Sequence, residues 1–156
     1  MFKREVRISI IIPNLHSPVI GQVLEAIRGQ EFELGQTEIL VVGLDRYGLV
    51  KEDGLTRFIS TEKPASPAQA RNLGAVAARG ETLIFLDADC VPQPGWLKAM
   101  IEAHTRWPDA GAMSGAMLAE GDTFVAHCGQ IAVFHEHLVL HRPGQRRTLA
   151  SFSLLV

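Results

Sequence analysis

The sequence is poor in the residues that mark several classes of protein. Its 156 residues include two cysteines, one tyrosine and two tryptophans. The cysteines, Cys90 and Cys128, are too few for a disulfide framework and lack metal-site spacing, so they indicate reduced cytosolic thiols. The formal net charge of −2 lacks the basic excess of a dedicated nucleic-acid-binding protein. The composition also excludes collagen, low-complexity repeats and disorder.

Long apolar runs are also missing. No stretch approaches the roughly 18–20 residues that a bilayer crossing needs. The apolar block that begins at Ile8 is shorter than most signal-peptide cores, and no small-residue cleavage site follows it. We therefore expect a cytoplasmic protein, either free or peripheral to a membrane, that forms a single domain over residues 1–156.

Short apolar strands alternate with helical segments along most of the chain. Apolar runs predict strands over residues 8–12, 38–42, 57–60, 82–86 and 112–118, and an edge strand over 149–156. Helical spacing or alanine-rich composition predicts helices over residues 18–28, 68–79 and 94–104. Alternation of this kind favours an α/β fold with three layers around a mostly parallel sheet.

Serine, proline and glycine punctuate these elements. Ser17 and Ser66 each precede a proline, and we expect both to be helix N-caps with the proline at the first helical position. Pro13 and Gly43 are expected to end the first two strands, because proline removes a ladder donor and glycine favours turns. Gly80 is expected to end the alanine-rich helix.

Two aspartates follow the fourth strand. In open α/β sheets ligands bind beyond the carboxyl ends of the strands. Asp87 and Asp89 are two residues apart at such an end, so an extended backbone would point both carboxylates the same way. Mg²⁺ and Mn²⁺ commonly take one or two carboxylates together with substrate phosphates. The pair predicts a metal–diphosphate site, and the alternative is a solvated turn in which aspartates bond backbone amides.

Besides the two aspartates, Arg71 and Cys90 are residues of possible functional interest near predicted strand and helix ends. Arg71 falls in the first turns of the alanine-rich helix, where positive potential suits a phosphate or a base carbonyl. The alternative for Arg71 is a surface arginine whose stem packs on the sheet. Cys90 is interpreted as a small packing residue rather than a nucleophile, because no base is evident beside it.

Several segments together resemble one known family, the family 2 glycosyltransferases, which have a GT-A fold. The resemblance covers about residues 6–118 and fades beyond them. It rests on the order and spacing of five segments: Ile8-Ser9-Ile10-Ile11-Ile12-Pro13-Asn14, residues 38–42, Ser66-Pro67-Ala68-Gln69-Ala70-Arg71-Asn72-Leu73-Gly74, residues 78–89 ending in Asp87-Ala88-Asp89, and residues 92–97. The resemblance implies a nucleotide-diphospho sugar donor, such as a UDP- or GDP-sugar, bound with Mn²⁺ or Mg²⁺.

The resemblance also implies roles for particular residues. Asp89 would ligate the metal that bridges the diphosphate, and Asp87 would touch the ribose or support the metal. Arg71 would reach the base or the phosphates. Pro13 and Asn14 would line the nucleotide pocket. These five residues, together with Asp45 discussed next, form the predicted substrate and metal site.

The sequence departs from the family pattern at two places. Family members often carry an aspartate directly after the second strand, whereas this chain has Gly43. Either Asp45 takes that role from a shifted loop, or the preference for uracil is lost. The family's catalytic base lies in a later acidic motif, and the acceptor half is expected to be missing from this chain. Glu120 and Asp122 have nothing that ties them to that role, so the base is unassigned.

Two functions follow from these expectations. The first is a glycosyltransferase-like protein that binds a nucleotide-diphospho sugar and a divalent metal for inverting transfer to an unidentified acceptor. The second is a non-catalytic module that keeps the nucleotide-sugar pocket and acts in binding or assembly. In that case the truncated edge would expose apolar surface that self-association could cover.

Overall fold

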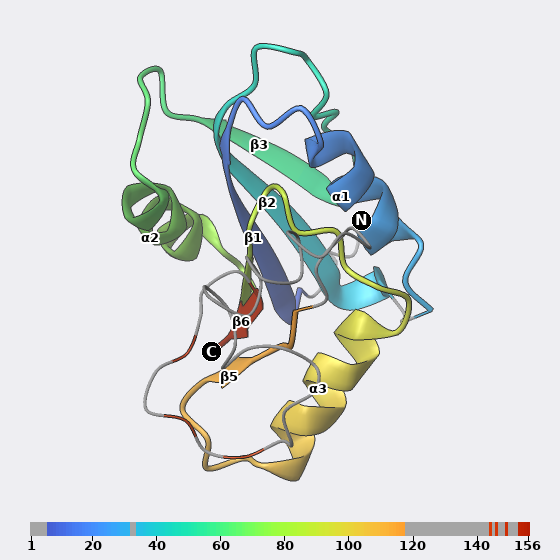
Figure 1. Cartoon of the computed structure of the whole chain (residues 1–156). Helices are drawn as coiled ribbons and strands as arrows, with labels where there is room; N and C mark the ends of the chain where they lie inside the picture. The colour runs from blue at the N-terminus through green and yellow to red at the C-terminus, as the bar shows by residue number, and fades with distance from the viewer. Residues whose placement is uncertain (1–5, 32–33, 118–143, 145, 147–148, 150–152) are drawn as a thin grey trace, which may run out of the picture.

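The structure is a computed structural model that describes residues 6–31, 34–117, 144, 146, 149 and 153–156. Six strands in these residues form one sheet in the order β3-β2-β1-β4-β6-β5 (Figure 1). The first four strands in that order are parallel, whereas β6 is antiparallel to both β4 and β5. The predicted α/β fold with a mostly parallel sheet is confirmed.

The elements follow the predicted alternation closely. The strands are β1 Ile8–Leu15, β2 Thr37–Leu44, β3 Thr56–Ser60, β4 Thr82–Leu86, β5 Met113–Ser114 and β6 Ser153–Leu155. The helices are α1 Ile20–Arg28, α2 Pro67–Ala77 and α3 Trp96–Arg106, with a 3₁₀ turn η1 Leu34–Gln36 before β2.

Helices cover both faces of the sheet. Helices α1 and α3 pack on one face, and α2 packs on the other (Figure 1). Alternate residues of β1 divide between the two layers: Ile10 and Ile12 join the core under α1, and Ile11 joins the core under α2. All three side chains are fully buried. A strand covered on both faces reads as a continuous apolar run, which explains the unbroken isoleucines of β1.

Pro13 and Gly43 do not end their strands, contrary to prediction. β1 continues past Pro13 to Leu15, and β2 continues past Gly43 to Leu44, with Asn14 directly opposite Gly43. β1 pairs with β4 only as far as Ile11, so Pro13 stands where that side of the strand has become an edge. A proline is tolerated at such a position because no neighbouring strand needs its N–H.

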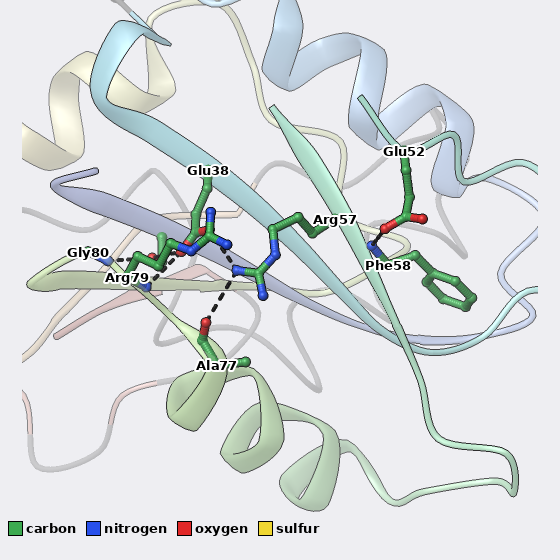
Figure 2. Close-up of polar contacts among 8 residues, drawn as sticks. Glu38, Glu52, Arg57, Phe58, Ala77, Arg79 and Gly80 are labelled. Carbon is green, nitrogen blue, oxygen red and sulfur yellow. Dashed lines mark hydrogen bonds and ion pairs between the residues drawn. The ribbon is translucent and has the colours of Figure 1, made fainter. Parts of the chain in front are cut away.

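Two helix ends also differ from prediction. Helix α1 begins after Val19 and has no side-chain cap; the Ser17 hydroxyl instead donates to the carbonyl of Ala88, at 2.9 Å. Helix α2 has the predicted Ser66 cap, in a reciprocal capping box with Gln69. It ends at Ala77 rather than residue 79, because the chain turns to meet the buried Glu38, whose carboxylate accepts the amide of Arg79 at 2.7 Å (Figure 2).

The sequence predicted that the last strand is an edge strand, and this prediction is wrong. β6 lies between β4 and β5, with Ser153 opposite Leu86. The predicted strand over residues 112–118 is reduced to the two residues of β5. Residues 118 and 150–152 lie outside the described residues, as do Glu120, Asp122 and Cys128. Among the helices that the structure describes, none combines the length and apolar character of a membrane span.

Candidate functional site

The carboxyl ends of three neighbouring parallel strands form the centre of the candidate site. Pro13 and Asn14 are among the last residues of β1, whereas Asp45 follows β2 and Asp87 and Asp89 follow β4. These strands are adjacent in the sheet, so their exit loops meet at one edge (Figure 1). The edge is the position at which α/β sheets bind ligands.

Asn14 holds two exit loops together with its side chain. The side chain is almost fully buried; its amide nitrogen donates to the Leu44 carbonyl at 2.9 Å, and its oxygen accepts the Ser17 amide at 3.0 Å. Pro13, the preceding residue, is half-buried and pairs with Val42. Asn14 therefore uses its amide group to shape the edge.

The backbone at position 43, directly after the apolar part of β2, requires glycine. Its φ is +137°, a region that side chains rarely adopt, and a Cβ atom there would lie 2.0 Å from the carbonyl oxygen of Asn14. An aspartate at position 43 is incompatible with this close approach of β1 and β2. The nearest acidic residue along the chain is Asp45, in the loop that follows the strand.

The two carboxylate oxygens of Asp45 differ in their hydrogen bonds within the described part of the chain. Oδ2 accepts the amide of Val50 at 2.7 Å, which closes the first turn of the β2–β3 loop. Oδ1 is buried and has no hydrogen-bond partner in the described residues. A buried acceptor without a donor is costly, and such atoms in native proteins call for an explanation. A ligand N–H or O–H group would supply the missing donor.

Arg71 reaches the edge from helix α2. The helix lies close to the sheet because Gly74 has no side chain: a Cβ atom there would be 2.4 Å from Cγ2 of Ile11. At this depth Arg71 forms an ion pair with Asp87, with 2.5 Å between Nη2 and Oδ1. The arginine side chain is 19% exposed and the aspartate side chain 34%. The Nε–H of Arg71 is buried and has no acceptor in the described part of the chain.

Asp87 and Asp89 lie in a turn rather than in extended strand. β4 ends at Leu86, and the amide of Cys90 donates to the carbonyl of Asp87 at 3.1 Å. The Ser17 hydroxyl holds the buried Ala88 between them from the β1 side. The extended backbone expected at Asp87 and Asp89 is therefore absent, and the turn sets the directions of the two carboxylates. Asp87 pairs with Arg71, whereas the Asp89 side chain is exposed.

The Cys90 thiol reports the charge of this turn. Burial raises its pKa, and the neighbouring carboxylates of Asp89 and Asp87 raise it further, to about 12. The sulfur lies 3.8 Å from Oδ1 of Asp89 and packs against the core. A thiol with this pKa stays protonated near neutral pH, which agrees with the predicted packing role. Both carboxylates act on one thiol, so the turn concentrates negative charge.

His16 is a site residue that the sequence interpretation missed. Its backbone amide donates to the Leu44 carbonyl at 2.9 Å, and its Nδ1 accepts the amide of Arg46 at 3.0 Å. Its φ is +58°, a left-handed conformation that no local sequence pattern announced. The only signal was a histidine two residues beyond Asn14, at the end of a strand that delivers ligand-facing residues.

A group of three or more candidate metal ligands from histidine, cysteine, aspartate and glutamate is absent among the described residues. Asp87 and Asp89 are the two carboxylates of the acidic turn, and their role as metal ligands stays a prediction. This set matches magnesium or manganese, which bind proteins through one or two carboxylates and take further oxygens from substrate phosphates. The catalytic base that the resemblance implies stays unassigned, and Glu120 and Asp122 lie outside the described residues.

Known proteins are similar to this chain at the level of sequence family. The sequence model of the family described as Glycosyl transferase family 2 matches residues 44–151, more than half of the chain. Glycosyltransferase AglE of Haloferax volcanii is 34% identical over 101 residues, which are 58% of this chain and 33% of that protein. Polypeptide N-acetylgalactosaminyltransferase 15 of Mus musculus is 33% identical over 69 residues, 44% of this chain and 10% of that protein. The chain thus spans a third or less of these relatives.

Solved structures are similar in fold. S. aureus TarS 1-349 in complex with UDP-GlcNAc has a TM-score of 0.60 at 20% identity, covering 76% of this chain and 36% of that one. The mannosyltransferase PcManGT of Pyrobaculum calidifontis, in complex with GDP-Man and Mn²⁺, has a TM-score of 0.56 at 21% identity, covering 73% and 36%. At these identities the likeness shows the fold alone, which is the GT-A fold that the sequence resemblance implied.

Proposed function

This chain belongs to glycosyl transferase family 2, and from that premise we propose that it binds a nucleotide-diphospho sugar with Mn²⁺ or Mg²⁺. The proposed reaction is inverting transfer of the sugar to an acceptor. The proposed site is the edge at which β1, β2 and β4 end, and residues 6–118 are its donor-binding part. The chain spans a third or less of these relatives, so the substrate and the reaction are both proposals about the whole protein.

One observation carries the proposal: the acidic turn of Asp87 and Asp89 lies between the β1 exit loop and Arg71 of α2. Ser17 fastens the turn on one side, and the Arg71–Asp87 ion pair fastens it on the other. A turn fixed at both sides keeps its backbone and the Asp87 carboxylate in place before a ligand arrives. Such preorganisation avoids an ordering cost at binding. The turn thus places acidic groups beside the positively charged guanidinium of Arg71.

Asp89 is the proposed metal ligand. Its exposed carboxylate is accessible to a metal cation, whereas the Asp87 carboxylate already forms an ion pair with Arg71. When bound, a divalent cation would offset the negative charge that builds on a diphosphate leaving group. Asp87 would support the cation or accept a ribose hydroxyl. Arg71 would contribute positive charge, and its unpartnered Nε–H, toward the base or the phosphates.

Asp45 is the proposed reader of the nucleoside. Its buried Oδ1 has no donor among the residues that the structure describes, and a base N–H or a ribose hydroxyl would supply one. Asp45 would thereby replace the aspartate that Gly43 makes impossible at the end of β2. Pro13 and Asn14 would line the pocket, and Asn14 would act through the loops that its side chain joins.

The solved relatives support a nucleotide-sugar donor of this class. TarS is in complex with UDP-GlcNAc in one structure and with UDP in another, and PcManGT is in complex with GDP-Man and Mn²⁺. These ligands share a nucleoside diphosphate, which is the group that the acidic turn and Arg71 would hold. They differ in base and sugar, so the donor is proposed only as a UDP- or GDP-sugar.

Isothermal titration calorimetry of the chain with UDP- and GDP-sugars tests the proposal. We expect binding of at least one donor that depends on Mn²⁺ or Mg²⁺. Asp89→Asn should weaken metal-dependent binding at least tenfold, or about 1.4 kcal/mol, because the amide loses the charge that holds the cation. The control is Asp109→Asn, at an exposed aspartate after α3, which should leave binding unchanged. Circular dichroism checks that both variants fold.

Binding without metal dependence, or no binding of any donor, contradicts the proposal. A transfer assay with a mixed acceptor pool separates the transferase from a non-catalytic module. Turnover by the chain as a monomer would exclude the module that self-associates. Donor binding without turnover, in a chain whose mass in solution corresponds to an oligomer, would favour the module.

A further inference from the structure

We infer that His16 is a positioning residue that fixes the backbone on both sides of Asp45 and so determines how tightly the site holds the nucleoside. The inference rests on the proposed function, because it concerns the same nucleotide site. It goes further by giving a role to a residue that neither the sequence pattern nor the likeness to known proteins assigns. The evidence is a pair of hydrogen bonds that bracket Asp45.

The two bonds join His16 to the residues before and after Asp45. The His16 amide donates to the Leu44 carbonyl at 2.9 Å, and the His16 Nδ1 accepts the Arg46 amide at 3.0 Å. The peptide groups that flank Asp45 are therefore both held by one residue of the β1 exit loop. Asn14 adds a second donor to the Leu44 carbonyl, at 2.9 Å. On the following side the Arg46 amide bonds to His16, and the Asp45 carbonyl of the same peptide group accepts the Gly48 amide at 3.4 Å within the loop, so His16 makes the contact from the β1 side.

The loop beyond Asp45 needs such a restraint. Residues 45–55 contain no helix or strand, and Arg46, Tyr47 and Leu49 are exposed. Asp45 itself is tied within the loop by the Val50 amide. If the Arg46 amide were released, the carboxylate would keep its bond to Val50 but lose its fixed orientation to β1. The buried Oδ1, which lacks a partner in the described residues, would then meet a ligand donor less often.

Both the backbone and the ring of His16 suit this task. Its φ is +58°, and histidine and asparagine are enriched among the non-glycine residues in that conformation. Nδ1 can accept an N–H only when it carries no proton, so the neutral ring has its proton on Nε2. Asparagine would place an oxygen close to the position of Nδ1, whereas glutamine would place its oxygen farther out, near Nε2.

Three variants test the assignment by calorimetry with UDP, or with GDP if that nucleotide binds more tightly, in the presence of Mn²⁺. His16→Ala and His16→Gln should each weaken nucleotide binding at least tenfold. His16→Asn should stay within about threefold of the wild type, because it restores the acceptor and tolerates the left-handed backbone. The control, His104→Asn on α3, makes the same chemical change away from the edge and should have no effect.

A second ligand separates positioning of Asp45 from general damage to the site. Pyrophosphate with Mn²⁺ occupies the acidic turn but has no nucleoside for Asp45 to contact. His16→Ala should therefore leave the Kd for pyrophosphate within twofold while the Kd for the nucleotide rises. Equal losses for both ligands would mean a merely structural role. Equal affinity of the alanine variant and the wild type for the nucleotide would also overturn the assignment.

Amide hydrogen exchange distinguishes failure of this inference from failure of the proposed function. The Arg46 amide should be protected in the wild type and in His16→Asn, and should exchange at least tenfold faster in His16→Ala. If the wild type binds neither nucleotide, the proposed function fails, and the role in nucleotide binding fails with it. Faster exchange would then still establish the restraint on Asp45. Unchanged exchange of Arg46 in the alanine variant contradicts the restraint itself.

Discussion

Asn14, Asp45 and Arg71 differ in how much of their hydrogen-bonding capacity the protein itself uses. Asn14 places both ends of its amide in bonds to neighbouring loops. Asp45 and Arg71 each keep one buried atom without a partner, Oδ1 and Nε, and these are two of the four such side-chain atoms in the described residues. Unpartnered buried polar atoms are costly. At the candidate site, Oδ1 of Asp45 and Nε of Arg71 are therefore the buried atoms available to a ligand, whereas the other two, on Thr37 and His104, lie away from it.

Cys90 provides a residue-scale prediction. With its pKa raised from 9.0 to about 12 by burial and by Asp89 and Asp87, the thiol should react about a thousandfold more slowly with iodoacetamide at pH 8 than an unperturbed cysteine. The rate should rise tenfold per pH unit, because only the thiolate reacts. Peptide mass spectrometry after timed labelling measures the rate at this residue, with a cysteine-containing peptide as reference.

Asp89→Asn should raise the Cys90 labelling rate, because it removes the nearer negative charge. It should not restore the rate of a free cysteine, since burial is the larger cause of the shift. A rate at pH 8 equal to that of the reference peptide would contradict the placement of the thiol beside the acidic turn.

At the scale of elements, the depth at which α2 packs decides whether Arg71 meets Asp87. The capping box of Ser66 and Gln69 starts the helix, and its small residues Ala70 and Gly74 face the sheet. Gly74 has a lower helix propensity than alanine, yet the backbone of α2 could not approach Ile11 with a side chain there. Gly74 thus lowers the helix propensity of α2 but allows the helix to pack closely against the sheet.

Gly74→Ala should therefore destabilise the protein by about 1–3 kcal/mol, although alanine is the better helix former. The reason is overpacking against Ile11, whose Cγ2 would be 2.4 Å from the new Cβ. Urea unfolding followed by circular dichroism measures the change. The same variant should weaken nucleotide binding, because it displaces Arg71 from Asp87.

The matched control is Gly21→Ala in α1, where a Cβ atom would have no heavy atom within 4 Å apart from its chain neighbours and the nearby backbone of its own helix. That substitution should be neutral or stabilise the protein by up to about 1 kcal/mol. If both glycine variants change the free energy of unfolding alike, contact between α2 and the sheet is not what requires Gly74.

At the scale of the whole molecule, a buried carboxylate joins the ends of the sheet and helix layers away from the candidate site. Glu38 on β2 is 4% exposed. It accepts the Ser9 hydroxyl of β1 at 2.8 Å. It also accepts the Arg79 amide at 2.7 Å and Nη1 of Arg57 on β3 at 2.9 Å (Figure 2). Arg57 also donates to the Ala77 carbonyl at the end of α2, at 3.3 Å. One side chain thus connects three strands and the exit of α2.

Glu38→Ala should lower the free energy of unfolding by about 3 kcal/mol, because it leaves buried donors without their acceptor. Thermal and urea unfolding measure this loss. Glu102→Ala is the control: its ion pair with Lys98 spans 4.0 Å, and both side chains are 62% exposed. Removing that surface pair should cost less than about 1 kcal/mol. Equal effects of the two substitutions would contradict a connecting role for Glu38.

Local sequence patterns determined most elements of this protein. The isoleucines of β1, the cap of α2 and the bounds of β4 could be predicted because each depends on residues close together in the chain. The same patterns placed the acidic turn and Arg71 at strand and helix ends, and the order of motifs indicated the family. Their roles in binding stay predictions until the titrations above are made.

Other features were decided only by the tertiary structure. Pro13 and Gly43 lie within strands because neighbouring strands, rather than their own propensities, determine where pairing continues. β6 lies between β4 and β5, and local sequence patterns could not predict this position because both partner strands are distant in sequence. The restraint of Asp45 by His16 joins residues that are close only after β1 and β2 have paired. Local propensity acts over a few residues, whereas these contacts exist only when the chain has folded.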